Sequence, residues 1–205
     1  VTLTLHTPNV TCTIKDNLGT GAILCVNDNP ASPSISANDN SGNFNITNIH
    51  ATSSGLDSHV FNLHYCSGVI DSCTLTDTGT LVSDRQTVIC GIYADSSFEG
   101  GSLIEIKNCT FVGGKHLGIY ITQAIAGSSV HGNTIACNSR YTDAYAISVP
   151  DNPNGMTVYG NTINQTCGRG ILVDQYSFAW GIISIHDNVI VTQEQDGILI
   201  GNGAG

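Results

Sequence analysis

A six-residue phrase that recurs along the chain constrains its fold more than any other feature. The phrase has an aliphatic residue, two variable residues, Asn or Cys, Thr or Val, and finally Ile, Leu or Phe. Clear copies begin at Ile70, Ile106, Val130, Val158 and Ile185. Their Asn/Cys positions lie 24 to 36 residues apart, which is the period of a solenoid in which each repeat adds one turn. The chain is therefore expected to wind, not to fold as a conventional globule.

A second phrase follows the first in constant order. It starts with Gly or Ala, continues with Ile, and is seen at residues 91–94, 118–121, 146–149, 170–173 and 197–200. Inward aliphatic residues alternate in it with outward mixed residues, which is the period of a half-buried strand. Weaker copies extend the array toward the N-terminus, with Cys12-Thr13-Ile14 before residues 21–24, and residues 46–51 before residues 60–63. About seven turns are thus expected.

A turn this short, with three brief strands and no helical pattern, predicts a cylinder of parallel sheets whose turns rise by about 4.8 Å. The two phrases resemble those of the right-handed parallel β-helix proteins of the pectin-lyase-like superfamily, which include bacteriophage tailspikes and polysaccharide lyases. The resemblance covers nearly all of residues 1–205. It implies an all-β fold, a right-handed single-stranded parallel β-helix of about seven coils, and it is specific for fold and not for activity.

Composition agrees with this fold. Only 11% of the residues are charged and 40% are hydrophobic, which suits one continuous narrow core, so residues 1–205 are expected to form a single domain. No apolar run is long enough to cross a membrane. The chain starts at Val1 in what looks like the middle of a turn and ends at Gly205 without a cap. Because uncapped ends expose pairing edges, we expect a fragment of a longer polypeptide or a product whose ends are covered by partners.

The eight cysteines admit two interpretations. An even number suggests extracellular disulfides. Cys12, Cys73 and Cys109, however, occupy the phrase position that holds Asn133 and its successors, and side chains stacked in register about 4.8 Å apart do not converge as a disulfide requires. We expect these three to be buried thiols beside a ladder of stacked amides. The redox state of the other five cysteines stays open.

Four of the six cations fall in the turn between the two phrases, on four successive coils. They are Arg85, Lys115, Arg140 and Arg169. Stacking of the coils predicts a loose basic column down one side. The alternative is a set of solvated turn cations that form ion pairs with the nearby aspartates, Asp84, Asp143 and Asp196.

Two of these turns, at residues 76–87 and 138–143, are longer than the minimum. Insertions on a solenoid rise from one face, often the binding face, so we expect them to wall a groove along the Gly-Ile strands. Tyr93 and Tyr120 lie on its predicted floor, with Ser148 and Leu172 after them, and the next outward row begins with Asp95. Adjacent tyrosines offer flat faces to sugar rings, although a plain aromatic stack is the alternative. An elongated groove favours a polysaccharide as the ligand.

Two chemistries suit such a groove. A glycosidase needs two carboxyls at most about 9.5 Å apart. This excludes Asp95 with Asp174, three coils or roughly 14 Å apart. It leaves Asp143 with Asp84 or Glu99, and Asp174 with Asp196. A lyase needs Lys or Arg to abstract a proton, and Lys115 beside Asp143 is the best such pair, although a surface ion pair is the bland alternative. The candidate catalytic residues are Lys115, Asp143, Arg169 and Asp174. The candidate substrate-binding residues are Tyr93, Tyr120, Arg85, Arg140 and Asp95.

The formal net charge of −10 repels polyanions at long range and argues against nucleic acid as a partner. No cofactor or metal site is expected, with Ca²⁺ as an option through Asp28, Asp39 and Asp151, where simple turns are the alternative.

The first functional hypothesis is a tailspike-like β-helix, at the virion surface or extracellular, that binds and cleaves a bacterial surface polysaccharide. Tailspikes associate as trimers, so a homotrimer without membrane insertion is part of this hypothesis. The alternatives are a non-catalytic adhesin or passenger domain and a structural shaft.

Overall fold

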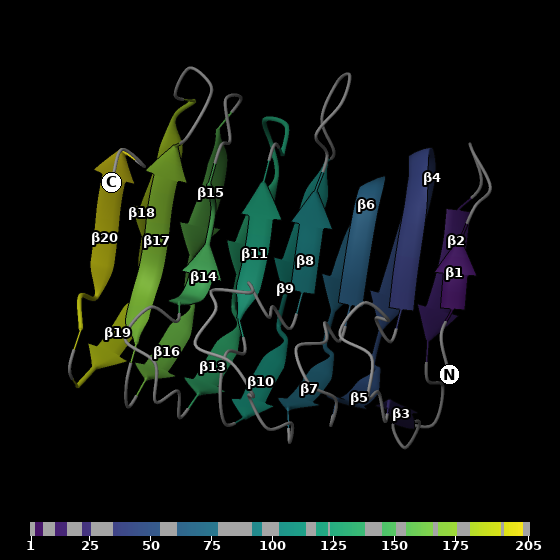
Figure 1. Ribbon diagram of the computed structural model, residues 1–205, viewed down its shortest axis with the longest axis horizontal. Coiled ribbons are helices and arrows are strands. Elements are labelled where there is room, and N and C mark those ends of the chain that lie inside the picture. The colour runs from purple at the N-terminus through teal and green to yellow at the C-terminus, as the bar shows by residue number, and fades with distance from the viewer. Residues whose placement is uncertain are drawn as a thin grey trace.

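The computed structural model of the chain describes residues 3–5, 11–15, 22–25, 35–53, 61–77, 92–95, 103–113, 118–122, 124–137, 145–150, 155–165, 168–175, 181–193 and 195–202. Within these residues every regular element is a β-strand, and the strands run side by side from the N-terminal to the C-terminal end of the molecule (Figure 1). The strand pairs are parallel, and each strand pairs with its equivalent one turn away. The predicted fold class, an all-strand parallel β-solenoid, is confirmed.

Each complete turn contributes three strands, and equivalent strands form three stacks. Stack 1 contains β9 (Ile104–Lys107), β12 (Ser129–His131), β15 (Met156–Tyr159) and β18 (Ile183–His186). Stack 2 contains β3 (Ala22–Cys25), β5 (His50–Ser53), β7 (Thr74–Asp77), β10 (Thr110–Gly113), β13 (Thr134–Cys137), β16 (Thr162–Gln165) and β19 (Val189–Thr192). Stack 3 contains β8 (Ile92–Asp95), β11 (Ile119–Thr122), β14 (Tyr145–Ser148), β17 (Arg169–Gln175) and β20 (Ile198–Asn202).

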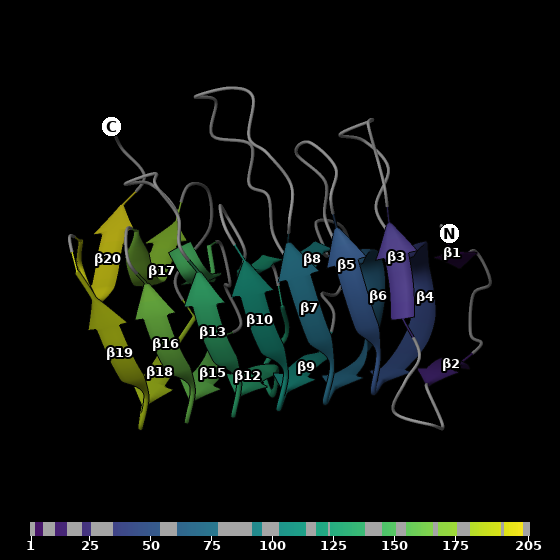
Figure 2. The same ribbon diagram turned by 90° about the horizontal axis from the view of Figure 1, so that it is seen from below.

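Two long strands join stacks 1 and 3 near the N-terminal end. They are β4 (Ile35–Thr47) and β6 (Phe61–Asp71). β4 pairs with β6 on one side and with β1 (Leu3–Leu5) and β2 (Thr11–Lys15) on the other. The first part of β6 pairs with β8 of stack 3 and its last part with β9 of stack 1. Stacks 1 and 3 therefore belong to one 13-stranded sheet, whereas stack 2 is a separate 7-stranded sheet, seen along the near side of the molecule in Figure 2.

The predicted copy at residues 46–51 and 60–63 is in the expected register, since Ile46 pairs with Ile70 and Phe61 with Ile92. The first N-terminal copy, at Cys12 and residues 21–24, is misplaced by part of a turn. Cys12 pairs with Phe44, and it is Ile14 that pairs with Ile46 and so corresponds to Ile70. Residues 22–25 form β3 of stack 2, and not a Gly-Ile strand of stack 3. The error arises because a three-residue match such as Cys12-Thr13-Ile14 does not define which residues of neighbouring turns pair. The register is fixed only by pairing along the whole strand. Three successive turns, which begin with β9, β12 and β15, are described almost in full, and the total of about seven stays a prediction.

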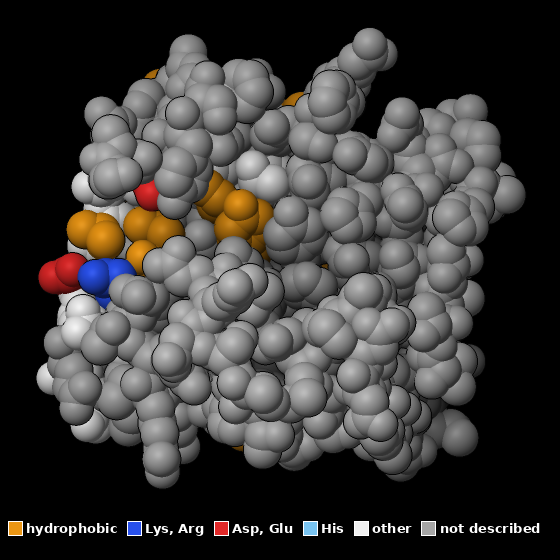
Figure 3. Space-filling view, in the orientation of Figure 1, with side chains coloured by type: hydrophobic (Ala, Val, Ile, Leu, Met, Phe, Trp, Pro, Cys, Tyr) orange, Lys and Arg blue, Asp and Glu red, His pale blue; other side chains and the backbone are white. Residues whose placement is uncertain are grey.

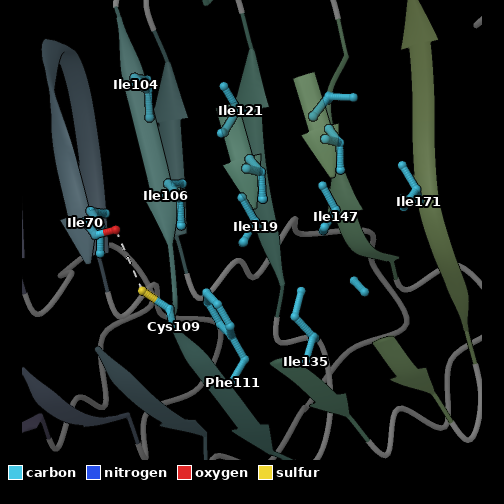
Figure 4. Close-up of a cluster of buried hydrophobic side chains, with 14 of the residues drawn as sticks. Ile70, Ile104, Ile106, Cys109, Phe111, Ile119, Ile121, Ile135, Ile147 and Ile171 are labelled. Atoms are coloured by element: carbon cyan, nitrogen blue, oxygen red, sulfur yellow. Dashed lines mark hydrogen bonds between the residues drawn. The ribbon is translucent and has the colours of Figure 1, made fainter. Parts of the chain in front are cut away.

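The core consists of inward side chains from all three stacks, arranged in vertical files. In stack 1 the file runs through Ile70, Ile106, Val130 and Val158, and each of these side chains is fully buried. Stacks 2 and 3 contribute similar files, which converge on the same narrow interior in Figure 4, with Phe111 as the largest buried side chain. The alternation of buried and less buried residues in β9 and β15 is the period-two pattern predicted from the sequence.

The corner between stacks 1 and 2 needs a residue with positive φ on every turn. Asn48, Ser72, Asn108 and Asp187 have φ of 53° to 56°, and Gly132 and Gly160 have φ of 65° and 63°. These residues stand directly before the Asn/Cys position of each turn, at the second of the two positions that the sequence analysis treated as variable. Only Gly and small polar residues tolerate this conformation readily, so the position is restricted by backbone geometry.

From Cys73 onward, the next residue of each described turn builds the predicted file of Asn and Cys side chains, which is confirmed, and Ile49 holds the same position one turn before Cys73. The Nδ2 of Asn161 donates to the Oδ1 of Asn188 at 2.9 Å, and the Nδ2 of Asn133 donates to the Oδ1 of Asn161 at 3.0 Å. The same amides donate to carbonyls on the turn before, Val130 for Asn161 and Ile106 for Asn133. The ladder thus satisfies buried polar groups along the solenoid axis.

Cys73 and Cys109 continue this file as free, buried thiols, as predicted. The Sγ of Cys109 lies 3.8 Å from the carbonyl oxygen of Ile70 (Figure 4), the contact that an amide makes on later turns. The interaction with Cys73 and burial raise the pKa of the Cys109 thiol. Cys109 is therefore protonated and behaves as a small hydrophobe with a weak donor. The side chain of Cys12 lies outside the described residues.

Candidate functional site

The predicted floor residues on stack 3 occupy the expected row. Tyr120 pairs with Tyr93 on one side and with Ser148 on the other, and Ser148 pairs with Leu172. Asp95 is in register with Thr122 in the next outward row. The backbone therefore places these residues in a straight line along the axis, with one residue per turn.

At Ser148 and Leu172 this row is recessed relative to the outward row of stack 2, whereas Tyr120 in the same row is part-buried. Ser148 and Leu172 are each 7% exposed, and so is Thr122 in the neighbouring row. On stack 2, by contrast, the outward side chains of Val112 and Val191 are 45% and 52% exposed. Figure 3 shows hydrophobic side chains gathered on the stack 3 face, with acidic and basic side chains beside them. A floor whose outward side chains are this little exposed is typical of a concave surface.

Arg169 lies at the start of β17, between two neighbouring turns. Its guanidinium carbon is 5.5 Å from the centroid of the Tyr145 ring, and one terminal nitrogen donates to the Tyr145 hydroxyl at 3.0 Å. Its Nε is 3.6 Å from the Oδ2 of Asp196 on the following turn. The guanidinium is therefore held by the cation–π contact and the hydrogen bond to Tyr145, whereas the contact of its Nε with Asp196, whose side chain is 59% exposed, is an ion pair without a hydrogen bond. This favours the ion-pair alternative for Arg169, whose catalytic role stays a prediction.

The register argues against Asp174 and Asp196 as a glycosidase pair. The backbone carbonyl of Asp196 accepts from the amide of Gly170, near the start of β17, whereas Asp174 is in register with Gly201. Five strand residues then separate the two positions along the axis of the strand, roughly 16 Å. That distance exceeds the range of about 9.5 Å over which two carboxyls act together, so the pairing expected from sequence is wrong.

The other predicted site residues cannot be placed by their side chains. Arg85, Lys115, Arg140 and Asp143 lie outside the described residues. For Tyr93 and Asp95 only the backbone is described. The basic column and the pair formed by Lys115 and Asp143 therefore stay predictions.

Sequence reasoning missed a second ordered surface, on the outer face of stack 1. The rings of His131, Tyr159 and His186 stack on successive turns, with centroids 4.6 Å and 5.2 Å apart and planes inclined by 8° and 10°. They occupy the first variable position of the recurring phrase, and aligning the copies by that position is the signal that would have found them. Because the rings cover one another, their edges and not their faces point to solvent.

Charged residues flank this ring stack. The two carboxylate oxygens of Glu105 contact the Nζ of Lys107 at 2.8 Å and the Nε2 of His131 at 3.1 Å. The hydrogen bonds from Lys107 and His131 hold the pKa of Glu105 below its usual range, and the hydrogen bond to Glu105 raises the pKa of Lys107. The positive charge of Lys107 is thus paired with the carboxylate of Glu105. These groups are about one-third exposed or less, so solvent weakens the interaction.

No group of three or more His, Cys, Asp or Glu side chains in the described ranges is arranged to hold a metal ion. Asp28 and Asp151 lie outside those ranges and Asp39 is described by its backbone alone, so the Ca²⁺ option stays untested. The described residues also include no helix long and apolar enough to span a membrane.

Comparison with known proteins agrees with the fold. The family described as a right handed beta helix region matches residues 61–205, which are 145 of the 205 residues. No curated protein and no solved structure matches the chain. The matched range contains the recessed row of stack 3, the ring stack of stack 1 and the whole Asn/Cys file.

Proposed function

Because this chain belongs to the right-handed β-helix family, we propose that its recessed stack 3 face binds a polysaccharide. The observation that carries the proposal is the burial of the outward residues Ser148 and Leu172, in a row where every turn contributes one residue. Successive turns repeat at about 4.8 Å, so the row offers similar contacts along its length. A linear polymer can use such a surface, whereas a small metabolite would occupy one part of it.

The chemistry of the row suits sugars. Tyr120 supplies a hydroxyl group that donates and accepts hydrogen bonds, and Ser148 and Leu172, each 7% exposed, form the floor along the axis from it. Ligand sites commonly combine a mostly apolar floor with a few polar groups that set orientation.

A bulky residue placed on this floor tests the proposal. Ser148→Trp fills the recessed row, so it is expected to weaken polysaccharide binding by about tenfold or more, which is roughly 1.4 kcal/mol. Binding is measured on immobilised capsular and O-antigen polysaccharides. Thr134→Trp is the matched control, since Thr134 is an exposed outward residue of stack 2. Equal binding by the two variants, with thermal unfolding showing both folded, would rule out the stack 3 face.

Cleavage of the bound glycan is the second part of the proposal. Lys115 and Asp143 are the candidates, because the sequence places them at the same offset from strands on adjacent coils. If they act in the reaction, Lys115→Ala and Asp143→Ala are each expected to lower the rate about a hundredfold or more. New reducing ends mark a hydrolase, and unsaturated sugar absorbance marks a lyase. Full activity in both variants would exclude Lys115 and Asp143 as catalytic residues.

The biological setting extends the same proposal. A polysaccharide-cleaving β-helix of the tailspike type would act on bacterial surface glycans, at the virion surface or outside the cell, as a homotrimer. A non-catalytic adhesin is the second candidate, favoured by the separation of Asp174 from Asp196 along β17. Binding without any product formation would support the adhesin.

A further inference from the structure

We infer that Asp196 restricts the stack 3 site to uncharged sugars by holding Arg169 in an ion pair. This role of Asp196 rests on the proposed polysaccharide binding. It names a class of ligand, a neutral glycan, and a single residue that sets the preference.

The geometry fixes Arg169 between two turns of the solenoid. Tyr145 is its register partner in β14, and its ring and hydroxyl contact the guanidinium from that side. Asp196 contacts it from the following turn, and the main chain of Asp196 is itself anchored because its carbonyl accepts from the amide of Gly170 at 3.1 Å. The Arg169 side chain is 20% exposed. The cation is thus held in place with a carboxylate already beside it.

An acidic sugar needs an available cation at its binding site. A uronate carboxylate that leaves water must be met by a charged donor, or its desolvation opposes binding. On the described part of stack 3 there is one positive charge, Arg169, against three negative ones, Asp95, Asp174 and Asp196. The net charge of −10 adds long-range repulsion of polyanions. A neutral sugar meets neither obstacle, because its hydroxyls donate to carboxylate oxygens and accept from Arg and Tyr.

Lys107 provides an internal comparison. It is also paired with a carboxylate, Glu105, at 2.8 Å, but it lies on the outer face of stack 1. Glu105→Gln and Asp196→Asn therefore remove the same charge by the same change of a carboxylate to an amide. Of the two changes, only Asp196→Asn removes a carboxylate from beside a cation on stack 3.

The test uses polygalacturonate as a defined acidic polymer. Asp196→Asn is expected to raise binding of polygalacturonate roughly tenfold and to make it sensitive to salt, while Glu105→Gln leaves binding at the wild-type level. Adding Arg169→Gln to Asp196→Asn is expected to abolish the gain. An Asp196→Asn variant that binds polygalacturonate no better than wild type, or no better than Glu105→Gln, would overturn the inference.

A glycan array of neutral and uronate polysaccharides separates this inference from the proposed function. Retention of neutral polymers by the wild-type chain is the expected result. Preferential retention of uronate polymers would overturn the role of Asp196 while supporting polysaccharide binding. Failure of the wild-type chain to retain any polysaccharide would overturn the proposed function itself.

Discussion

Asn161→Leu is expected to lower the free energy of unfolding by about 4 kcal/mol. Asn161 is fully buried, and its Oδ1 accepts from both the backbone amide and the Nδ2 of Asn133. Its Nδ2 donates to the carbonyl of Val130 and to Asn188. Leucine fills a similar volume but removes the acceptor of the buried Asn133 backbone amide, and it takes one partner each from the Nδ2 of Asn133, the carbonyl of Val130 and the Oδ1 of Asn188. An unsatisfied buried group costs about 1 to 3 kcal/mol. Urea unfolding followed by far-UV circular dichroism measures the loss.

Asn164→Leu is the matched control for this change. Asn164 is exposed on the outer face of stack 2, three positions after Asn161, so the same substitution is expected to change stability by less than about 0.5 kcal/mol. A similar loss of stability in both variants would mean that the amide ladder does not stabilise the solenoid.

Gly118→Ala is expected to destabilise the fold by about 3 kcal/mol. A Cβ at this position would lie 2.5 Å from the backbone oxygens of both Tyr145 and Ala146. These are backbone atoms of the neighbouring turn, so the strands of stack 3 must separate to admit the methyl group. Differential scanning calorimetry measures the change, and the shift of β11 is also expected to weaken polysaccharide binding at Tyr120.

Gly201→Ala serves as the comparison within the same stack. The nearest atom to a Cβ at Gly201 is the Oδ1 of Asp174 at 3.8 Å, which is an ordinary contact. Because alanine also loses less backbone entropy than glycine, this variant is expected to be neutral or slightly stabilising. If Gly118→Ala proved as stable as Gly201→Ala, the close approach of turns at Gly118 would be disproved.

Several features of the fold followed directly from the sequence because the repeat is nearly periodic. Copies of a phrase in equivalent positions predict parallel pairing, and the register between β10 and β13 or between β15 and β18 matches that alignment residue by residue. Burial of Cys73 and Cys109 followed from the same alignment. Toward the N-terminus the copies are degenerate, and there the prediction slipped at Cys12, because the merged strand β4 has no counterpart in the phrases.

The candidate site was predictable only in outline. The order of Tyr120, Ser148 and Leu172 along stack 3 was correct, since register follows from alternation. The contacts of Arg169 with Tyr145 and Asp196, and the separation of Asp174 from Asp196, were not predicted. They depend on whether a residue lies opposite the first or the last residues of the neighbouring strand. The ring stack of His131, Tyr159 and His186 was missed because the position looked variable in sequence.

The sequence by itself therefore determined that the chain winds as a parallel β-solenoid and which side chains stack in its core, because each turn repeats the chemistry of the one before. Only the tertiary structure decided which outward row is recessed and which carboxylate meets Arg169. Exposure and ion pairing depend on how neighbouring turns approach one another, and a one-dimensional pattern with period two assigns all outward rows the same environment.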